Sequence, residues 1–471
     1  MTSSTRRRVA SNTAIQLAGK GVVLALGAVS IAVLTRYLGP GDYGRFTLAL
    51  VYMQLFAVLA DVGLYTTVVR DISKDPSRTE VLVGNTLTLR LVLSLAVIVL
   101  ACALSLLLPY EPDVRVAIAL AGAPLLFGML ASSYVAVLQS RLRMGRAVVG
   151  DVVGRAMALG LTLLVAGLDL GFYAVMGAAA GGTLTTLLVT WGLTRRLVAL
   201  RFRFEPAVWR RLLVTAFPLG LALAVNAVYF RADTLIISLY EPFGQVGLYT
   251  LSYRILELAL VLGTIFLNTG FPALSAAVAH DEARARRAIQ SSFDLLVILG
   301  VPLVAGGFVL APDVVDLVAG PDFADAAEPL RILLVAGALA WVNGVFGFAL
   351  IAKERQLSAL WLNLSGLVFN IGLNFIFVPR YGIVAAAVIT VASEVLILAG
   401  SYSLMRRNFD FFPVPRTLAP ALAAAGAMAG LLWLLQEFFV VLVALLGVAL
   451  YAVLLWILSP ASRTVATGLR R

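Results

Sequence analysis

Four ionisable side chains lie well inside apolar segments of this sequence, at a similar depth in each. Lys20, Arg90 and Arg155 are basic and Asp61 is acidic, and each lies 7 or 8 residues from one end of its segment, about 10–12 Å along an α-helix. A charge in hydrocarbon costs about 2.5–3.5 kcal/mol, so each group requires a partner or a water-filled cavity. Three cations against one acid leave surplus positive charge. Since guanidinium and ammonium groups bind phosphate oxygens, the surplus suits an anionic headgroup.

A structural interpretation of the same residues stays open. In this alternative Asp61 pairs with Lys20 or Arg90 to hold helices together, and the remaining cations extend to the lipid headgroups. For Arg155 the structural interpretation is favoured, because Asp151 lies four residues earlier on the same helical face.

Charged residues of the second half lie nearer the other end of their segments. Arg254 and Glu257 are three residues apart, which predicts a neutral pair on one helical face. Arg231 is the stronger candidate for a cavity residue, because Asp233 points away from it on a helix. Arg36 ends the first segment; an interfacial anchor is favoured over a role in substrate release.

Amide side chains and one acid complete the candidates. Asn363, Asn370 and Asn374 share one face of the eleventh predicted helix, Asn343 lies in the tenth segment and Asn226 in the seventh. Amides hydrogen-bond sugar hydroxyls, but they also hold membrane helices together, and the second role is favoured. Near the middle of its segment, Glu394 has two open roles: proton or cation coupling, or structural pairing.

Taken together, these residues form the expected site. For substrate binding we expect Lys20, Arg90, Arg231, Arg36, Arg254, Asn226, Asn370 and Asn374, and as charge partners or coupling groups Asp61, Glu257 and Glu394. No catalytic residue, metal or cofactor is expected, because Cys102 and His280 are the single residues of their types.

The elements that position these residues are fourteen apolar segments, each long enough to cross about 30 Å of hydrocarbon as a helix. They are 13–37, 45–69, 83–108, 116–139, 147–168, 171–193, 213–238, 247–276, 290–318, 329–351, 359–378, 383–405, 416–434 and 438–459. Alternate gaps and the termini hold 26 of the 36 Lys and Arg residues, and the other gaps hold 4. The positive-inside rule therefore predicts that both termini are cytoplasmic in a plasma-membrane protein.

Composition agrees with this class. The chain is 61% hydrophobic and 13% charged, too apolar for a water-soluble surface. Its net charge of +11 does not indicate nucleic-acid binding, because the basic residues lie in short gaps, where anionic membrane lipids attract them. The gap 194–212 mixes Arg with Leu, Val, Phe and Trp, which is typical of a segment in the headgroup region.

The chain contains an internal repeat. GRFTLA at 44–49 matches GLYTLS at 247–252, and LGFYAVMGAAAGG from 170 matches YGIVAAAVITVAS from 381. The predicted organisation is a six-helix lobe (1–193), an interfacial cytoplasmic linker (194–212), a second six-helix lobe (213–405), and two further helices with a cytoplasmic tail (406–471). This parallel repeat predicts an all-α transporter whose two lobes rock around a cavity that the first and seventh helices face.

Three stretches carry a family resemblance: RYLGPGDYGRFTLAL (36–50), YFRADTLIISLY (229–240) and NIGLNFIFVPRYGIVAAAVITVASE (370–394). They resemble the polysaccharide-repeat-unit flippases of the multidrug/oligosaccharidyl-lipid/polysaccharide exporter superfamily. The resemblance implies a V-shaped pair of lobes that moves a polyprenyl-diphosphate-linked oligosaccharide from the inner to the outer leaflet by alternating access. Implied partners are this lipid-linked substrate, a coupling cation or proton, and polysaccharide assembly machinery.

Rival functions remain open at this point. A cation-coupled multidrug exporter of the same superfamily usually needs twelve helices and an acidic cavity, whereas the buried charge here is mainly basic. A membrane polysaccharide polymerase or glycosyltransferase generally needs a large catalytic loop, and these gaps are short, so no enzyme is expected. A passive scramblase or a structural assembly protein is the third rival.

Overall fold

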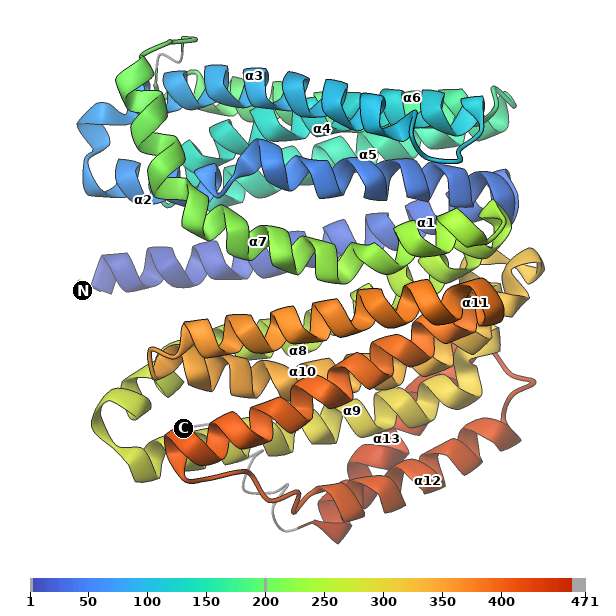
Figure 1. The fold of residues 1–471 in the computed structure, drawn as a ribbon. Helices are drawn as coiled ribbons and strands as arrows, with labels where there is room; N and C mark the ends of the chain where they lie inside the picture. Colours follow the sequence, from blue (N-terminus) through green and yellow to red (C-terminus); the bar gives the residue numbers. More distant parts are fainter. Residues whose placement is uncertain (1–2, 199–200, 460–471) are drawn as a thin grey trace. The chain divides into compact units, whose positions relative to one another are not determined.

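The computed structural model describes residues 3–198 and 201–459, except for the side chains of residues 3–17, 222, 226 and 262. The expected tail from residue 460 onward lies outside the described residues. The chain divides into two compact units, Met1–Gly247 (unit 1) and Leu248–Arg471 (unit 2), each a bundle of helices (Figure 1). Helices are the only regular elements in the described part of the chain, which confirms the all-α class.

Unit 1 holds seven α-helices, a short 3₁₀ turn and the first residues of an eighth helix. They are α1 (Ser3–Asp61), α2 (Leu64–Lys74), η1 (Pro76–Arg78), α3 (Thr79–Ser105), α4 (Pro112–Ser140), α5 (Met144–Gly167), α6 (Phe172–Thr194), α7 (Pro206–Tyr240) and the start of α8 (Phe243–His280). Unit 2 holds the rest of α8, α9 (Glu282–Ala319), η2 (Pro321–Ala326), α10 (Ala327–Ala352), α11 (Gln356–Phe409), α12 (Leu418–Leu434) and α13 (Val440–Leu458).

Ten of the helices in the described chain are long and apolar enough to cross a membrane, and α7 makes an eleventh if its two halves, bent by 42°, form one span. The remaining apolar helix, α12, is shorter. A multi-pass membrane protein is therefore the class that the structure supports.

Two of these helices are interrupted by a glycine that permits a backbone other residues rarely adopt. In α1 the interruption is Gly39 (φ 66°), followed by Pro40, and α1 turns back on itself there (Figure 1). In α11 it is Gly382 (φ 60°). A Cβ built on Gly400 would lie 2.3 Å from Leu362, so the two arms of α11 pack antiparallel around this glycine.

The turn after Gly39 packs closely against the start of α8 within unit 1. A Cβ on Gly44 would lie 1.9 Å from the carbonyl oxygen of Phe243, and a Cβ on Gly247 would lie 2.2 Å from that of Pro40. The contact is reciprocal: each glycine packs against the carbonyl oxygen of the residue four positions before the other glycine. Only residues without a side chain permit this contact.

The α4–α5 and α10–α11 turns have the same geometry. In the first, Leu142 has a φ of 54° and the Arg143 amide donates to the Leu138 carbonyl at 2.8 Å. In the second, Glu354 has a φ of 59° and the Arg355 amide donates to the Leu350 carbonyl at 2.8 Å. Both are helix C-terminal motifs in which a left-handed residue lets a later amide satisfy a terminal carbonyl, here without glycine.

Candidate functional site

Arg90 is the most deeply buried cation of unit 1. Its side chain is 0% exposed and forms an ion pair with Asp61 at the end of α1. The other terminal nitrogen donates to the hydroxyls of Ser132 and Ser133 and to the carbonyl of Met129, all on α4. The cluster neutralises the guanidinium and gives both of its terminal nitrogens hydrogen-bond acceptors, as a buried charge requires. The structure therefore brings Arg90 and Asp61 together in the interior of the bundle.

The Arg90–Asp61 pair lies beside a break in the chain. Val62 (φ 44°) and Gly63 (φ 77°) separate α1 from α2, and α7 crosses this break at close range. A Cβ on Gly63 would lie 2.8 Å from the Ala216 carbonyl oxygen, and one on Gly220 would lie 2.5 Å from the Val62 carbonyl carbon. The 42° bend of α7 falls at the same level, directly after Leu221. Asp61 therefore belongs to a buried ion pair and also lies next to two irregular backbone sites: the break between α1 and α2, and the bend in α7.

Lys20 has a different environment. Its side chain is exposed, although the adjacent Gly19 packs against Val148 of α5, where a Cβ would lie 2.0 Å away. Lys20 forms no ion pair with any acidic side chain in the described part of the chain. By contrast, Arg155 pairs with Asp151 at 3.1 Å on the surface, as its i, i+4 spacing predicted.

Lys20 and Arg231 occupy different levels of unit 1. The helical segment of Lys20 ends at Gly39 and that of Arg231 ends at Tyr240. The turns that follow these two residues contact each other through Gly44 and Gly247, so Gly39 and Tyr240 lie at the same end of unit 1. Lys20 is 19 residues from Gly39 and Arg231 is 9 residues from Tyr240, or about 28 Å and 14 Å along a helix. Arg231 is half-buried on α7, and the two cations are about 14 Å apart along the bundle.

Arg36 and Arg254 complete the basic candidates. Arg36 is exposed, next to Tyr37, whose hydroxyl contacts Asp169 at 3.1 Å and the Gly171 amide at 2.9 Å. The predicted pairing of Arg254 with Glu257 is present in unit 2 at 3.0 Å, with both side chains about 30% exposed.

Among the polar candidates of unit 2, Asn343 and Glu394 join two helices. The Asn343 amide on α10 donates to the carboxylate of Glu394 at 2.7 Å and to its backbone carbonyl at 2.9 Å, and both side chains are buried. Asn374 donates to the backbone and side-chain oxygens of Asn370 on the same helix. Asn363 is exposed, so the three amides of the predicted stripe have unequal surroundings. The side chain of Asn226 lies outside the described residues.

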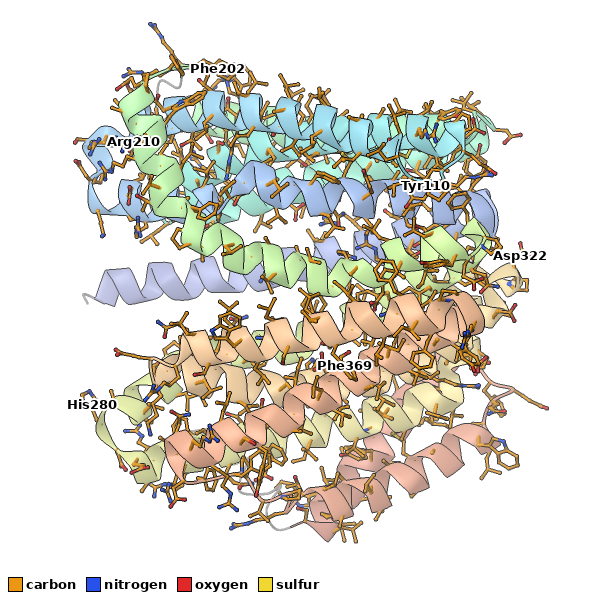
Figure 2. The ribbon with its side chains drawn as sticks, in the orientation of Figure 1. Tyr110, Phe202, Arg210, His280, Asp322 and Phe369 are labelled. Atoms are coloured by element: carbon orange, nitrogen blue, oxygen red, sulfur yellow. The ribbon has the colours of Figure 1, made fainter. Side chains whose placement is uncertain are left out.

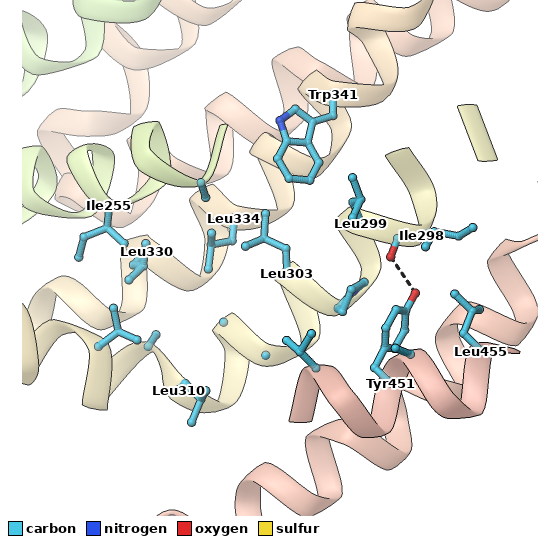
Figure 3. A pocket seen from close by; sticks show the side chains of 18 of the residues that line it. Ile255, Ile298, Leu299, Leu303, Leu310, Leu330, Leu334, Trp341, Tyr451 and Leu455 are labelled. Atoms are coloured by element: carbon cyan, nitrogen blue, oxygen red, sulfur yellow. Dashed lines mark hydrogen bonds between the residues drawn. The ribbon is translucent and has the colours of Figure 1, made fainter. Parts of the chain in front are cut away.

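Unit 2 also contains an apolar groove of about 860 Å³ among α8, α9, α10 and α13 (Figure 3). Its lining includes Leu303, Leu334, Trp341 and Leu455, and Tyr451 spans one side by donating to the Ile298 carbonyl at 2.8 Å (Figure 3). The helix α13 lies beyond the predicted repeat, so the appended helices contribute directly to this groove.

Comparison with known proteins shows the family of this chain. A family model for polysaccharide biosynthesis proteins matches residues 9–278, more than half of its length. The chain belongs to this polysaccharide biosynthesis family. A relative, the "probable low-salt glycan biosynthesis flippase Agl15" of Haloferax volcanii, is 25% identical over 411 residues, which cover 85% of each chain. The family resemblance read from the three sequence stretches is confirmed.

Solved structures similar to this polysaccharide biosynthesis protein identify the fold. The lipid II flippase MurJ in an inward closed conformation has a TM-score of 0.76 at 12% identity, covering 94% of this chain and 98% of that chain. An inward-facing multidrug resistance MATE transporter has a TM-score of 0.66 at 18% identity, covering 82% and 94%. The same helical fold thus occurs in flippases and in drug transporters.

Sequence reasoning on this family member offered Asp61 as a partner of Arg90 but missed the partners of Arg90 on α4. Ser132 and Ser133 were visible as adjacent hydroxyls in an apolar segment, and Gly63 as a glycine directly after Asp61 and Val62. Neither feature indicated a contact with Arg90, because Gly63 and the two serines are each more than 25 residues from Arg90 in the sequence.

Proposed function

We propose that this protein is a flippase that moves a polyprenyl-diphosphate-linked oligosaccharide from the inner to the outer leaflet of the cytoplasmic membrane by alternating access. The observation that carries the proposal is the flippase relative that aligns with 85% of both chains. The family match and the exposed Lys20, deep in an apolar helix, support it. A transporter accounts for these features without any catalytic group.

We infer that fourteen membrane crossings form two six-helix lobes followed by two helices. The glycine interruptions in α1 and α11 support counting each as two crossings, and the bent α7 and short α12 supply the rest. The repeat is supported by equivalent local structures at similar offsets: Gly44 with Gly247, Leu142 with Glu354, and Gly171 with Gly382. The proposed lobes follow the sequence repeat, whereas the compact units are divided within the first turns of α8.

In the proposed mechanism the diphosphate meets cations at successive levels. Lys20 contacts it first, as an exposed ammonium, and Arg231 receives it about 14 Å further along unit 1. Arg90, enclosed by Asp61 and the α4 hydroxyls, positions Asp61 at the helix break and does not bind the phosphate directly. Arg36 contributes to release. The groove in unit 2 suits a hydrocarbon chain, because its lining is almost wholly apolar.

Removing the charge of Lys20 tests the function. We expect Lys20→Gln to lower flipping of a fluorescent lipid-linked oligosaccharide in proteoliposomes by about tenfold, because a hydrogen bond to a charged group contributes roughly 1.5–3 kcal/mol. Arg155→Gln is the control, since Arg155 was predicted at the same depth but forms a surface pair. Normal flipping by a correctly inserted Lys20→Gln would exclude the diphosphate role. Absence of flipping by the wild-type protein would exclude the flippase.

We propose that both termini are cytoplasmic, because the basic residues gather in alternate gaps. A single cysteine introduced at Asp113 or Asp322 in a Cys102→Ala background should react with an impermeant maleimide added outside intact cells. A cysteine at Arg143 should react only after the cells are opened. All three positions are exposed, so accessibility does not bias the comparison. The reverse labelling pattern would invert the orientation.

A second candidate function is multidrug export coupled to a cation or proton. The likeness to a MATE transporter and the buried Glu394 favour it. Transport of a cationic dye by the same proteoliposomes, driven by an ion gradient and abolished by Glu394→Gln, would support export over flipping.

A further inference from the structure

The linker that joins α6 to α7 presents two aromatic side chains to the outside of unit 1. Residues 201–205 have no regular secondary structure, and Phe202 and Phe204 are 61% and 64% exposed. The linker is nevertheless fixed to α3. The Glu205 amide donates to the side chain of Asn85 at 2.8 Å, and the Arg203 amide donates to the Gly84 carbonyl at 3.3 Å. The exposure of the two rings is therefore a property of an ordered segment.

The linker between α11 and α12 provides an internal comparison. It is held by a side-chain amide in the same manner, because Gln290 near the start of α9 accepts from the Val414 amide at 2.9 Å and donates to its carbonyl at 2.8 Å. Here, however, the aromatic rings are packed. Phe412 lies 5.1 Å from Phe346 and 4.9 Å from Tyr402, ring centre to ring centre. Phe411 and Phe412 are therefore partly buried, whereas Phe202 and Phe204 are exposed, although Phe204 still contacts Trp209 edge-on at 4.8 Å between ring centres.

Exposed basic residues flank the two phenylalanines in the sequence. Arg195, Arg196, Arg201 and Arg210 are exposed, and none of them forms an ion pair with a described acidic side chain. Figure 2 shows Phe202 and Arg210 at the end of unit 1 where α7 begins. Arg203 and Arg211 have acidic neighbours at 4.0 Å and 3.5 Å, so the remaining four arginines give the surface a positive excess.

We propose that residues 201–205 and the first two turns of α7 form a docking surface for anionic phospholipid headgroups. Phe202 and Phe204 insert below the phosphates, and the surrounding arginines bind them. The membrane is the occupant that fits, because the linker joins two apolar helices and so lies at the bilayer surface, where aromatic and basic side chains combine. The proposal does not depend on which substrate the protein carries.

Thermal unfolding of the whole protein in nanodiscs tests this surface. We expect discs of phosphatidylcholine with phosphatidylglycerol to raise the wild-type midpoint above that in phosphatidylcholine alone. The variant F202S/F204S should lose this lipid-dependent shift, and its midpoint in phosphatidylcholine should fall only slightly, because Phe204 alone of the two rings has a ring contact, with Trp209. The matched control F411S/F412S should have a lower midpoint in both lipids, because its rings are packed, and should retain the shift. A full shift in F202S/F204S would overturn the proposal.

A second measurement reports the position of the linker directly. A polarity-sensitive fluorophore on Phe202→Cys, in a Cys102→Ala background, should emit at shorter wavelength in the discs containing phosphatidylglycerol and should be quenched there by lipids with a headgroup-proximal spin label. Water-like emission without quenching in both discs would overturn the proposal and leave a soluble protein as the occupant.

Discussion

Arg90→Gln is expected to destabilise the protein by about 3 kcal/mol or more, because removing one partner of a buried ion pair leaves the other charge uncompensated. Arg90 is 0% exposed and Asp61 is 21% exposed, so water cannot replace the lost guanidinium fully. The hydroxyls of Ser132 and Ser133 also lose their donor. Thermal unfolding of the purified protein, together with the yield in the membrane, measures the effect.

The controls separate a structural role from substrate binding. Arg155→Gln removes a pair that is half exposed and should change stability by less than about 1 kcal/mol. Asp61→Asn combined with Arg90→Gln should recover part of the loss, since no charge is then left alone. If Arg90→Gln unfolds at the wild-type temperature but fails to flip substrate, Arg90 binds the diphosphate in a conformation other than the one described.

Gly44→Ala and Gly247→Ala are expected to be strongly disruptive although each adds only one methyl group. Their Cβ atoms would lie 1.9 Å and 2.2 Å from backbone carbonyl oxygens, which cannot move as a side chain can. Overpacking of this kind costs typically 1–3 kcal/mol and more where backbone must shift, so we expect loss of folded protein. Gel filtration of the detergent extract and thermal unfolding detect it.

The same turns contain matched control positions. Gly41 and Gly244 each precede the critical glycine by three residues, and a Cβ on either meets no atom within 4 Å. Alanine at these positions should leave folding unchanged. Equal tolerance at all four positions would show that the two turns do not pack as described.

Local sequence spacing was sufficient where helix geometry alone sets a contact. Arg254 with Glu257 and Arg155 with Asp151 were predicted as pairs and are present, because residues three or four apart lie on one helical face whatever the surroundings. The length of the apolar segments was likewise a local property, and it was sufficient to predict the all-α class and the membrane-spanning helices. The family resemblance also came from contiguous stretches, and the family match confirmed it.

The tertiary structure decided the contacts that depend on how helices rotate against one another. Sequence reasoning left Asp61 with two candidate partners, and packing against α3 and α4 selected Arg90 and left Lys20 exposed. Tertiary packing also brings Asn343 into contact with Glu394, leaves Phe202 exposed and packs Phe412 against Phe346. A one-residue change in helix register rotates a side chain by about 100°, so which cation is enclosed depends on the packing of all neighbouring helices. No local pattern specifies that packing.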